Sequence, residues 1–588
     1  MIRDMFSNSR LFSNSASQLI EKNLQQLQNI NKKEDDALKS TYIQLNQKLK
    51  SLNYLDEVHQ FIEYLIQQEL FPNIFILNQL MTKFFKCRHV NLALKVFQII
   101  KHHQLQNIIT YNTLISQLSK QTQISWGVIY DIFLEAQQNC LVDTVTYNSI
   151  LHGVAKQSHV DKNLAIKIFE QAQSEQHINL VTYSTLLYVL ANSKPCDMQK
   201  ASHYFEEAKS LFSSLDEIII ANFLLCIGNS ENPNHEWVMQ TFQEAYDAQL
   251  MNAYIIANTL YALSRSKVAD VKLALRVFNV AKDLQLADPI TYANTLAIIA
   301  KSFAPDCQLA LSLLEEAKDH QLVDTVVYAC VLDIFAQSSK PDIQKALEIF
   351  NEAKQKNMVN HISYASMIQI LAKSYPLQLK KALELFEEVK KCHHVDSHIY
   401  GNILHVIAHC RPSPTDLAID ILHEAVLSQN IDIVCYANTL FAIANSIEPN
   451  QNLSFEIYES AKKQSFVNSI VATNLLTVVN RSYQPDIRIV EQLYQDSQHV
   501  FKADETFYLS LWFTLCHMQP LPIGFMVQIM NNAHGNLIPL ISYLMLETFQ
   551  PLMKAHVALS LELIKQTSST IMQLSQASIK DHSMALSY

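Results

Sequence analysis

Hydrophobic residues recur at helical spacing along most of the chain, in pairs of amphipathic segments separated by short polar turns. Residues 292–301 typify the first segment of a pair and residues 346–354 typify the second. In eight pairs a proline stands 12 or 13 residues after a fixed column of the first segment, which is most often tyrosine. Proline ends one helix and suits the first turn of the next. The pattern therefore predicts helix–turn–helix repeats and an all-α fold.

The repeat has an almost constant period. Successive members of the tyrosine column are separated by 34, 36, 36 and 37 residues, and then by 36 residues eight times. Because each helix pair can bury its apolar face only against its neighbours, the repeats are expected to stack around one continuous core. The column consists of Leu77, Tyr111, Tyr147, Tyr183, Ile220, Ile256, Tyr292, Tyr328, Tyr364, Tyr400, Tyr436, Ala472 and Tyr508.

Composition narrows the possible classes of protein. Hydrophobic residues make up 49% of the 588 residues and charged residues 17%, which excludes intrinsic disorder for most of the chain. Only six glycines are present, which disfavours β-sandwiches, Rossmann domains and P-loop enzymes. The formal net charge of −10 excludes a generally basic protein, so nucleic-acid binding would require a local arrangement of charge. The ten cysteines form no Cys-x-x-Cys pair, which indicates reduced thiols and an intracellular protein.

Several motifs of the repeat resemble the pentatricopeptide repeat family. They are Thr-Tyr-Asn-Thr-Leu-Ile at residues 110–115, a second helix of Ala-Leu-x-Leu-Phe-Glu-Glu type at residues 382–388, and Asp or Asn just before each new repeat. The resemblance covers about residues 74–520. It departs from the family in its 36-residue period, where 35 is usual, and in Ala208, Ala317 and Ala353, which replace a methionine. The tetratricopeptide repeat fits less well, since its 34-residue period and its signature residues are absent.

The resemblance implies an all-α, right-handed superhelical solenoid of about thirteen repeats that binds single-stranded RNA without catalysis. Processing, stability or translation of RNA is the expected process, and no cofactor, metal, membrane or small-molecule substrate is expected. Residues 1–36 are expected to be a mobile segment and residues 37–73 a degenerate capping repeat. The repeats then occupy residues 74–520, closing helices residues 521–566, and a mobile serine-rich tail residues 567–588. The weak presequence-like character of residues 1–23 leaves a cytoplasmic and a mitochondrial location open.

Two positions of each repeat are candidates for contact with RNA bases. The residue four places before the tyrosine column is Asp or Asn in all thirteen repeats, which is consistent with helix N-capping alone or with capping plus base contact. Its partner in the family is position 5, the residue directly after the tyrosine column, numbered from tyrosine as position 4. The predicted base contacts are Asn78, Asn107, Asn112, Asp143, Asn148, Asn179, Ser184, Asp216, Thr473 and Asp504.

Position 5 departs from the family in the middle of the chain, where it is mostly alanine, from Ala221 to Ala437. Alanine cannot hydrogen-bond a base edge. Two interpretations stay open: these repeats bind RNA with little selectivity, or they have become a scaffold that binds protein. The second is the alternative function for the whole chain.

Position 2 and a basic column complete the predicted interface. Position 2 is mainly apolar, which is consistent with packing between repeats or with base stacking by residues that include Ile109, Val145, Val181 and Ile218. The column nine residues after the tyrosine column contains seven Lys or Arg and no acid. These cations either compensate the helix dipole or follow the phosphate backbone. They are Lys86, Lys120, Lys156, Arg265, Lys301, Lys373 and Arg481.

Overall fold

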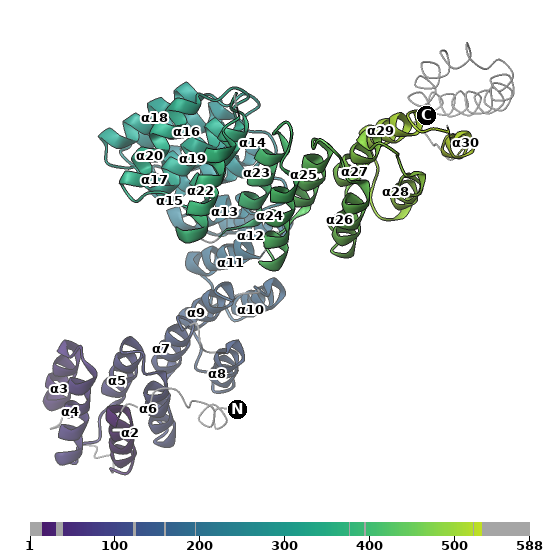
Figure 1. Cartoon of the computed structure of the whole chain (residues 1–588). Helices are drawn as coiled ribbons and strands as arrows, with labels where there is room; N and C mark the ends of the chain where they lie inside the picture. The colour runs from purple at the N-terminus through teal and green to yellow at the C-terminus, as the bar shows by residue number, and fades with distance from the viewer. Residues whose placement is uncertain are drawn as a thin grey trace, which may run out of the picture. The chain divides into compact units, whose positions relative to one another are not determined.

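The computed structural model describes residues 15–30, 39–121, 125–157, 160–193, 196–375, 377–392, 395–520 and 522–531. These residues form 29 helices and no strand, which confirms the prediction of an all-α repeat fold (Figure 1). None of the described helices is long and apolar enough to cross a membrane. The chain divides into an N-terminal half, residues 1–298, and a C-terminal half, residues 299–588.

From α3 onward, odd-numbered helices are the first helices of the repeats, and even-numbered helices are the second. The first helices are α3 (Lys39–Ser51), α5 (Ile74–Lys86), α7 (Ile108–Leu118), α9 (Thr144–Ala155), α11 (Leu180–Asn192), α13 (Glu217–Gly228), α15 (Ala253–Arg265), α17 (Pro289–Ala300), α19 (Thr325–Gln337), α21 (His361–Ala372), α23 (Ser397–Ala408), α25 (Ile433–Ala444), α27 (Ser469–Arg481) and α29 (Glu505–Cys516). The second helices are α4 (Leu55–Gln67), α6 (Val90–His102), α8 (Trp126–Gln138), α10 (Lys162–Ser174), α12 (Met198–Leu211), α14 (His235–Asp247), α16 (Val271–Asp283), α18 (Cys307–Asp319), α20 (Ile343–Gln355), α22 (Leu379–Cys392), α24 (Thr415–Leu427), α26 (Gln451–Lys463), α28 (Ile487–His499) and α30 (Ile523–Asn531).

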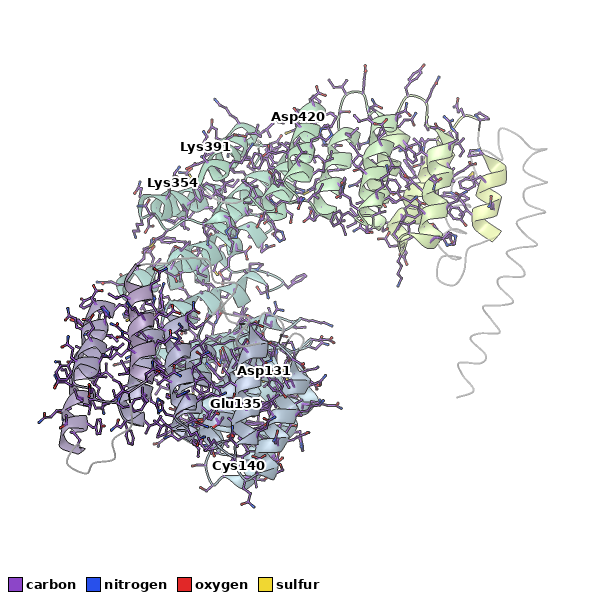
Figure 2. The ribbon with its side chains drawn as sticks, turned by 90° about the horizontal axis from the view of Figure 1, so that it is seen from below. Asp131, Glu135, Cys140, Lys354, Lys391 and Asp420 are labelled. Atoms are coloured by element: carbon purple, nitrogen blue, oxygen red, sulfur yellow. The ribbon has the colours of Figure 1, made fainter. Side chains whose placement is uncertain are left out.

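Most first helices pack on their own second helix and on the first helix of the next repeat. In the N-terminal half this gives the series α5, α7, α9, α11, α13 and α15, and in the C-terminal half the series α19 to α29. The thirteen repeats predicted at residues 74–520 thus begin with the first helices α5 to α29, and α30 lies beyond that range. Lys354, Lys391 and Asp420 lie along one side of the C-terminal half, on the second helices α20, α22 and α24 (Figure 2).

The tyrosine column lies in the core and ties three helices together. The hydroxyl of Tyr328 donates to Glu352 Oε1 at 2.7 Å, 24 residues later on the second helix of the same repeat. Lys318, on the preceding second helix, reaches the other oxygen of Glu352 at 2.7 Å. The same arrangement joins Tyr111, Glu135 and Lys101, Tyr364, Glu388 and Lys354, and Tyr400, Glu424 and Lys390.

The N-terminal segment differs from its prediction. Residues 15–28 form helix α2 (Ser15–Gln28), which packs against α4 and α6. Ile20, Leu24 and Leu27 are fully buried, because every third or fourth residue of α2 faces these helices. Residues 15–28 are thus part of the packed core and not a mobile segment. Residues 29 and 30 of the predicted segment are also described. Residues 1–14 and 31–36 lie outside the described residues.

The closing helices expected at residues 521–566 fall within the described part only at residues 522–531. There α30 buries Met526 and Ile529. The tail expected at residues 567–588 lies wholly outside the described residues.

The carboxylate of Glu352 makes a pH-dependent contribution to stability. Burial opposes its ionisation, but hydrogen bonds from Lys318, Lys356 and Tyr328 lower its pKa to about 2 from the ordinary 4.5. A carboxylate with a lowered pKa stabilises the folded state above pH 4.5, and this stabilisation is lost as pH falls toward 2.

We expect Glu352→Gln to lower the melting temperature by about 2 °C at pH 7, since the carboxylate is partly exposed and its ion pairs are screened. The difference from the unsubstituted protein should shrink as pH falls below 4.5. Circular dichroism melts across this pH range would measure it. Glu348→Gln on the same helix removes only an exposed pair with Lys345 and is the control. An equal effect of both substitutions would contradict the role given to Glu352.

Candidate nucleic-acid interface

The thirteen Asp and Asn residues of the cap column all cap first helices. In Asn107, for example, Oδ1 accepts the backbone N–H of Thr110 at 3.0 Å. Since Oδ1 is held by the helix in each case, the second side-chain atom, Oδ2 of Asp or Nδ2 of Asn, is the one available to a ligand. The column consists of Asn73, Asn107, Asp143, Asn179, Asp216, Asn252, Asp288, Asp324, Asn360, Asp396, Asp432, Asn468 and Asp504.

Position 5 and the cap column meet in two of the predicted pairs. Asn112 Nδ2 donates to Asp143 Oδ1 at 3.0 Å, and Asn148 Nδ2 donates to Asn179 Oδ1 at 3.5 Å. Burial opposes ionisation of Asp143, but hydrogen bonds from Thr146 and Asn112 lower its pKa, so it is an anionic acceptor at neutral pH. Both predicted partners in each pair therefore face the same space, with their polar atoms pre-oriented.

The other predicted pairs are arranged differently. Ser184 is buried, and its Oγ accepts a hydrogen bond from Asn222 of the next repeat at 3.1 Å, with none to Asp216 among the described contacts. No described contact joins Asn78 to Asn107 either. At three position-5 residues the structure leaves a buried oxygen without a hydrogen-bond partner within the described part. These oxygens are Asn78 Oδ1, Asn148 Oδ1 and Thr473 Oγ1. A buried acceptor of this kind gains from a ligand that donates to it.

Position 2 is exposed in every repeat. The exposed fraction of its apolar side chains ranges from 46% at Ile362 to 76% at Tyr254. These side chains are only partly buried, so packing between repeats, to which Val434 contributes beside Gly401, leaves much of their apolar surface free. Eleven of the thirteen first helices thus present an apolar side chain to solvent near the N-terminus. The exposed apolar members are Phe75, Ile109, Val145, Val181, Ile218, Tyr254, Ile290, Val326, Ile362, Val434 and Ile470.

The basic column partly serves a structural purpose. Lys373 donates to the backbone oxygens of Ala336 and Ser338, and burial lowers its pKa. Arg481 donates to the oxygen of Ala444 at 2.9 Å. Both close the C-terminal end of the preceding first helix, as the amides of Asn229 and Asn445 also do. These residues therefore stabilise the C-terminus of a helix, but the helix belongs to the preceding repeat.

The remaining members of the basic column lie at the exposed ends of their own first helices. They are Lys86, Lys120, Lys156, Arg265 and Lys301. Lys301 has a bonded or electrostatic partner. For the other four, the described residues offer no hydrogen-bond or ion-pair partner.

A second column of asparagines, two residues after the tyrosine column, was not foreseen from the sequence. Asn258 Nδ2 donates to the backbone oxygen of Ala221 at 2.8 Å, and Asn438 Nδ2 to that of Gly401 at 2.9 Å. In both cases the acceptor is position 5 of the preceding repeat. The available signal was the dipeptide Ala-Asn, which recurs where the earlier repeats have Asn-Thr or Asn-Ser. The column consists of Asn222, Asn258, Asn294, Asn402, Asn438 and Asn474.

This asparagine column gives a physical reason for small residues at position 5. The neighbouring first helix comes so close there that a Cβ added to Gly401 would lie 3.2 Å from Val434 Cγ1. Ala221, Ala293, Ala329 and Ala437 are almost fully buried in this contact. Position 5 therefore faces the neighbouring helix in the alanine repeats and contributes only its backbone oxygen to the polar contacts.

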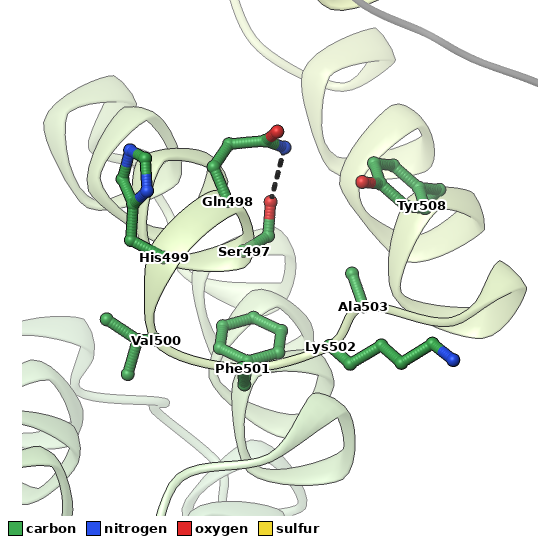
Figure 3. Close-up of a pocket in the computed structure, with 8 residues that line it drawn as sticks. All are labelled: Ser497, Gln498, His499, Val500, Phe501, Lys502, Ala503 and Tyr508. Carbon is green, nitrogen blue, oxygen red and sulfur yellow. Dashed lines mark hydrogen bonds between the residues drawn. The ribbon is translucent and has the colours of Figure 1, made fainter.

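In the described part of the chain, no group of three His, Cys, Asp or Glu is placed to hold a metal ion. A hollow of about 480 Å³ lies at the turn between α28 and α29, lined by residues 497–503 and Tyr508 (Figure 3). In it, Gln498 donates to Ser497 Oγ at 3.2 Å, and Lys502 and Tyr508 lie on separate parts of the wall.

Residues 63–121 match the family model of the pentatricopeptide repeat domain. This span covers the end of α4 and all of α5, α6 and α7, and the same helix pair recurs through the rest of the described chain. The chain thus contains a pentatricopeptide repeat domain at residues 63–121. A search among curated proteins finds no significant match.

Solved structures of one family member resemble the fold. The crystal structure of the pentatricopeptide repeat protein PPR10 from maize is 17% identical, with a TM-score of 0.55, and the match covers 92% of this chain and 76% of that one. PPR10 in complex with an 18-nt psaJ RNA element is 14% identical, with a TM-score of 0.46, covering 85% of this chain and 80% of that one. The first of these likenesses supports the solenoid fold of the present chain.

We expect Asn438→Ala to destabilise the protein by about 1–2 kcal/mol, because it removes the donor that satisfies the backbone oxygen of Gly401. Ser149→Ala changes the equivalent position of a repeat whose side chain has no described hydrogen bond, and it should have little effect. Urea denaturation followed by circular dichroism would compare the two. Equal midpoints for Asn438→Ala and Ser149→Ala would show that the asparagine column does not support stacking.

Proposed function

We propose that the protein binds single-stranded RNA, without catalysis, along the face formed by the N-terminal turns of its first helices. The observation that carries the proposal is the exposed apolar residue at position 2 of eleven of the thirteen repeats, which lies three residues before position 5 and two residues after the cap residue. Flat, apolar base faces gain from contact with such side chains, and hydrogen-bonding groups beside them can select the base edge.

Base selection is assigned to the early repeats. Asn112 with Asp143, and Asn148 with Asn179, present amide and carboxylate groups to one site per repeat. Following the family pattern, the pairs Asn78/Asn107, Asn112/Asp143 and Asn148/Asn179 select a pyrimidine, uracil and a pyrimidine, starting from the RNA 5′ end. Ser184/Asp216 selects guanine. Thr473 with Asp504 is a further pair near the end of the repeats.

The exposed cations are assigned to phosphate groups. Lys86, Lys120, Lys156 and Arg265 lie at the ends of first helices without a described partner, so they are available to an anion. Lys301 has the same place, while Lys373 and Arg481 also close a helix end. The process served is processing, stability or translation of RNA, in the cytoplasm or in mitochondria.

A helical-repeat scaffold for protein partners is the second candidate. It is favoured by one observation: position 5 of the alanine repeats is buried against the neighbouring helix and has no polar side chain. Selection of RNA from a random pool separates the candidates. A short pyrimidine-rich motif followed by a tolerant stretch is expected for the RNA binder, whereas a pool that enriches nothing, with folded protein, supports the scaffold.

Replacing the position-2 residues Ile109, Val145 and Val181 together by Ser should weaken RNA binding at least about tenfold, because each loses an apolar contact with a base. About half of each side chain is exposed, so the fold should persist. The matched control replaces Leu134, Leu211 and Leu284, which are exposed apolar residues at second helices of the same half. Fluorescence anisotropy with the selected RNA is the measurement. If both triple variants bind RNA equally well, the position-2 face is not the RNA site.

Replacing Lys86, Lys120 and Lys156 by Gln should weaken binding of all RNA sequences and reduce the salt slope by about 0.7 for each lost phosphate contact. Thermal stability should change little, because these side chains have no described partner. Lys373→Gln should instead lower thermal stability, since its amino group holds two backbone oxygens. A salt titration and a thermal melt of each variant distinguish the two groups. An unchanged salt slope in the triple variant would contradict the assignment to phosphate.

A further inference from the structure

The turns between first and second helices of the C-terminal half expose large aromatic side chains completely. The exposed fraction is 106% for Phe303, 100% for Tyr375 and 98% for Tyr483, and it is 81% for Ile447. All four residues occupy the same place, eleven residues after the tyrosine column. Aromatic side chains that contact nothing in the fold give it no packing energy, so the fold does not explain their recurrence. We name six of the seven described residues at this place in the C-terminal half the turn row, leaving out Gln519 of the last repeat: Phe303, Ser339, Tyr375, Arg411, Ile447 and Tyr483.

From Ser339 to Tyr483, the turns that carry the turn row lie side by side. Consecutive first helices from α19 to α27 pack against one another, so their C-terminal ends share one edge of the C-terminal half. Hydrogen bonds join neighbouring turns directly. The backbone N–H of Ser413 donates to the oxygen of Asn445 at 3.1 Å, and Ser482 Oγ donates to the oxygen of Pro449 at 3.1 Å. One ligand lying along this edge can therefore contact several turns in succession.

The same turns are locally basic, although the chain is acidic overall. The four-residue segments that begin nine residues after the tyrosine column contain five cations and one acid, Glu448, within a chain whose net charge is −10. Three residues after the turn row, Asp306, Asp342 and Asp486 cap second helices by accepting backbone N–H groups, and Asp486 also pairs with Arg488. The five cations are Lys301, Lys340, Lys373, Arg411 and Arg481.

Two arginines of these turns share a hollow. A space of about 260 Å³ over three successive turns has Arg411 and Arg481 on its wall, and Asn445 and Ile447 of the turn between them. One nitrogen of Arg481, Nη1, is fixed by the backbone oxygen of Ala444 and by Asn445 Oδ1, which orients the guanidinium group. Its other nitrogens and the guanidinium of Arg411 have no partner among the described residues. Two guanidinium groups around one hollow suit a phosphate group.

We propose that the turn row is a second contact surface for single-stranded RNA, separate from the position-2 face. Phe303, Tyr375 and Tyr483 stack on bases, and Arg411 and Arg481 bind a backbone phosphate. Exposed aromatic residues alternating with cations along one edge are the features that bind single strands without regard to sequence. This surface gives affinity in repeats whose position 5, such as Ala293 and Ala365, cannot select a base.

The positions of the exposed aromatic residues along the chain agree with a division between early repeats that select bases and later repeats that stack on them. In the N-terminal half, the described residues at the same turn position are Arg88, Glu231 and Lys267, none of them aromatic. The early repeats with Asn at position 5 thus depend on hydrogen bonds to bases, whereas the later repeats have stacking surfaces at their turns. The inference rests on the proposed function, because it adds a second surface for the same RNA.

The test uses the full-length protein with Phe303, Tyr375 and Tyr483 replaced together by Ser. Because these side chains are completely exposed, the variant is expected to fold normally. Binding of mixed-sequence single-stranded RNA should weaken roughly tenfold or more, with the motif selected from a random pool unchanged. The control replaces Tyr54, Tyr246 and Leu427, which are exposed residues outside the turn row. Equal affinity of the two triple variants overturns the proposal.

A second measurement addresses the arginines and the identity of the ligand. Arg411→Gln, at an exposed side chain without a described partner, should reduce the salt slope of RNA binding by about 0.7. A benzophenone amino acid placed at Tyr375 should cross-link to RNA under ultraviolet light. An unchanged salt slope, or a cross-link to protein and none to RNA, overturns the turn-row proposal. Loss of RNA binding in the position-2 variant but not in the turn-row variant would leave the proposed function intact and remove only this inference. Failure of the unsubstituted protein to bind RNA would remove both.

Discussion

In four repeats, a buried tyrosine hydroxyl that donates to a glutamate links neighbouring units of the stack. In the repeat of Tyr328 the acceptor is Glu352, and because a partly buried carboxylate needs a cation, Lys318 of the preceding second helix completes the set. One hydroxyl thereby fixes the distance between two helices of one repeat and the register of the next repeat. The set differs in the repeat of Tyr436, where the hydroxyls of Tyr436 and Ser460 share a hydrogen bond at 3.3 Å and Val426 stands where the lysine would be.

This fixed register places equivalent atoms of successive first helices on one face. The cap residue meets two demands there, since its Oδ1 holds the helix N-terminus while its second atom faces outward. Position 5 cannot both carry a polar side chain for a base and allow neighbouring first helices to approach closely. Asn112 retains a polar side chain beside Asp143, whereas Ala221 provides only a backbone oxygen, which Asn258 of the next repeat takes. Closer stacking and base selection therefore compete for the same position.

Features that depend on contacts within one repeat could be predicted from the sequence. The helix pairs follow from hydrophobic spacing, and the caps follow from Asp and Asn four residues before the tyrosine column. Features that depend on contacts with the neighbouring repeat could not be predicted from the sequence. Lys373 bonds to Ala336, 37 residues earlier, and Asn438 bonds to Gly401 at the same separation, so neither contact is visible in local periodicity. Helix α2 was missed because its few buried residues, such as Leu24, have partners only in α4 and α6. Whether the predicted site residues contact RNA stays a prediction.

The two proposed surfaces separate selectivity from affinity. A hydrogen bond selects a base only if the wrong base leaves a buried polar group unpaired, and the unpartnered oxygens of Asn78 and Asn148 meet that condition. Stacking on an exposed ring discriminates weakly, because every base has an aromatic face. Repeats that lost the polar side chain at position 5 can therefore still add to binding if an aromatic residue and a cation lie at another edge of the same helix. Selectivity then comes from a few early repeats, and the later repeats lengthen the complex without narrowing its sequence.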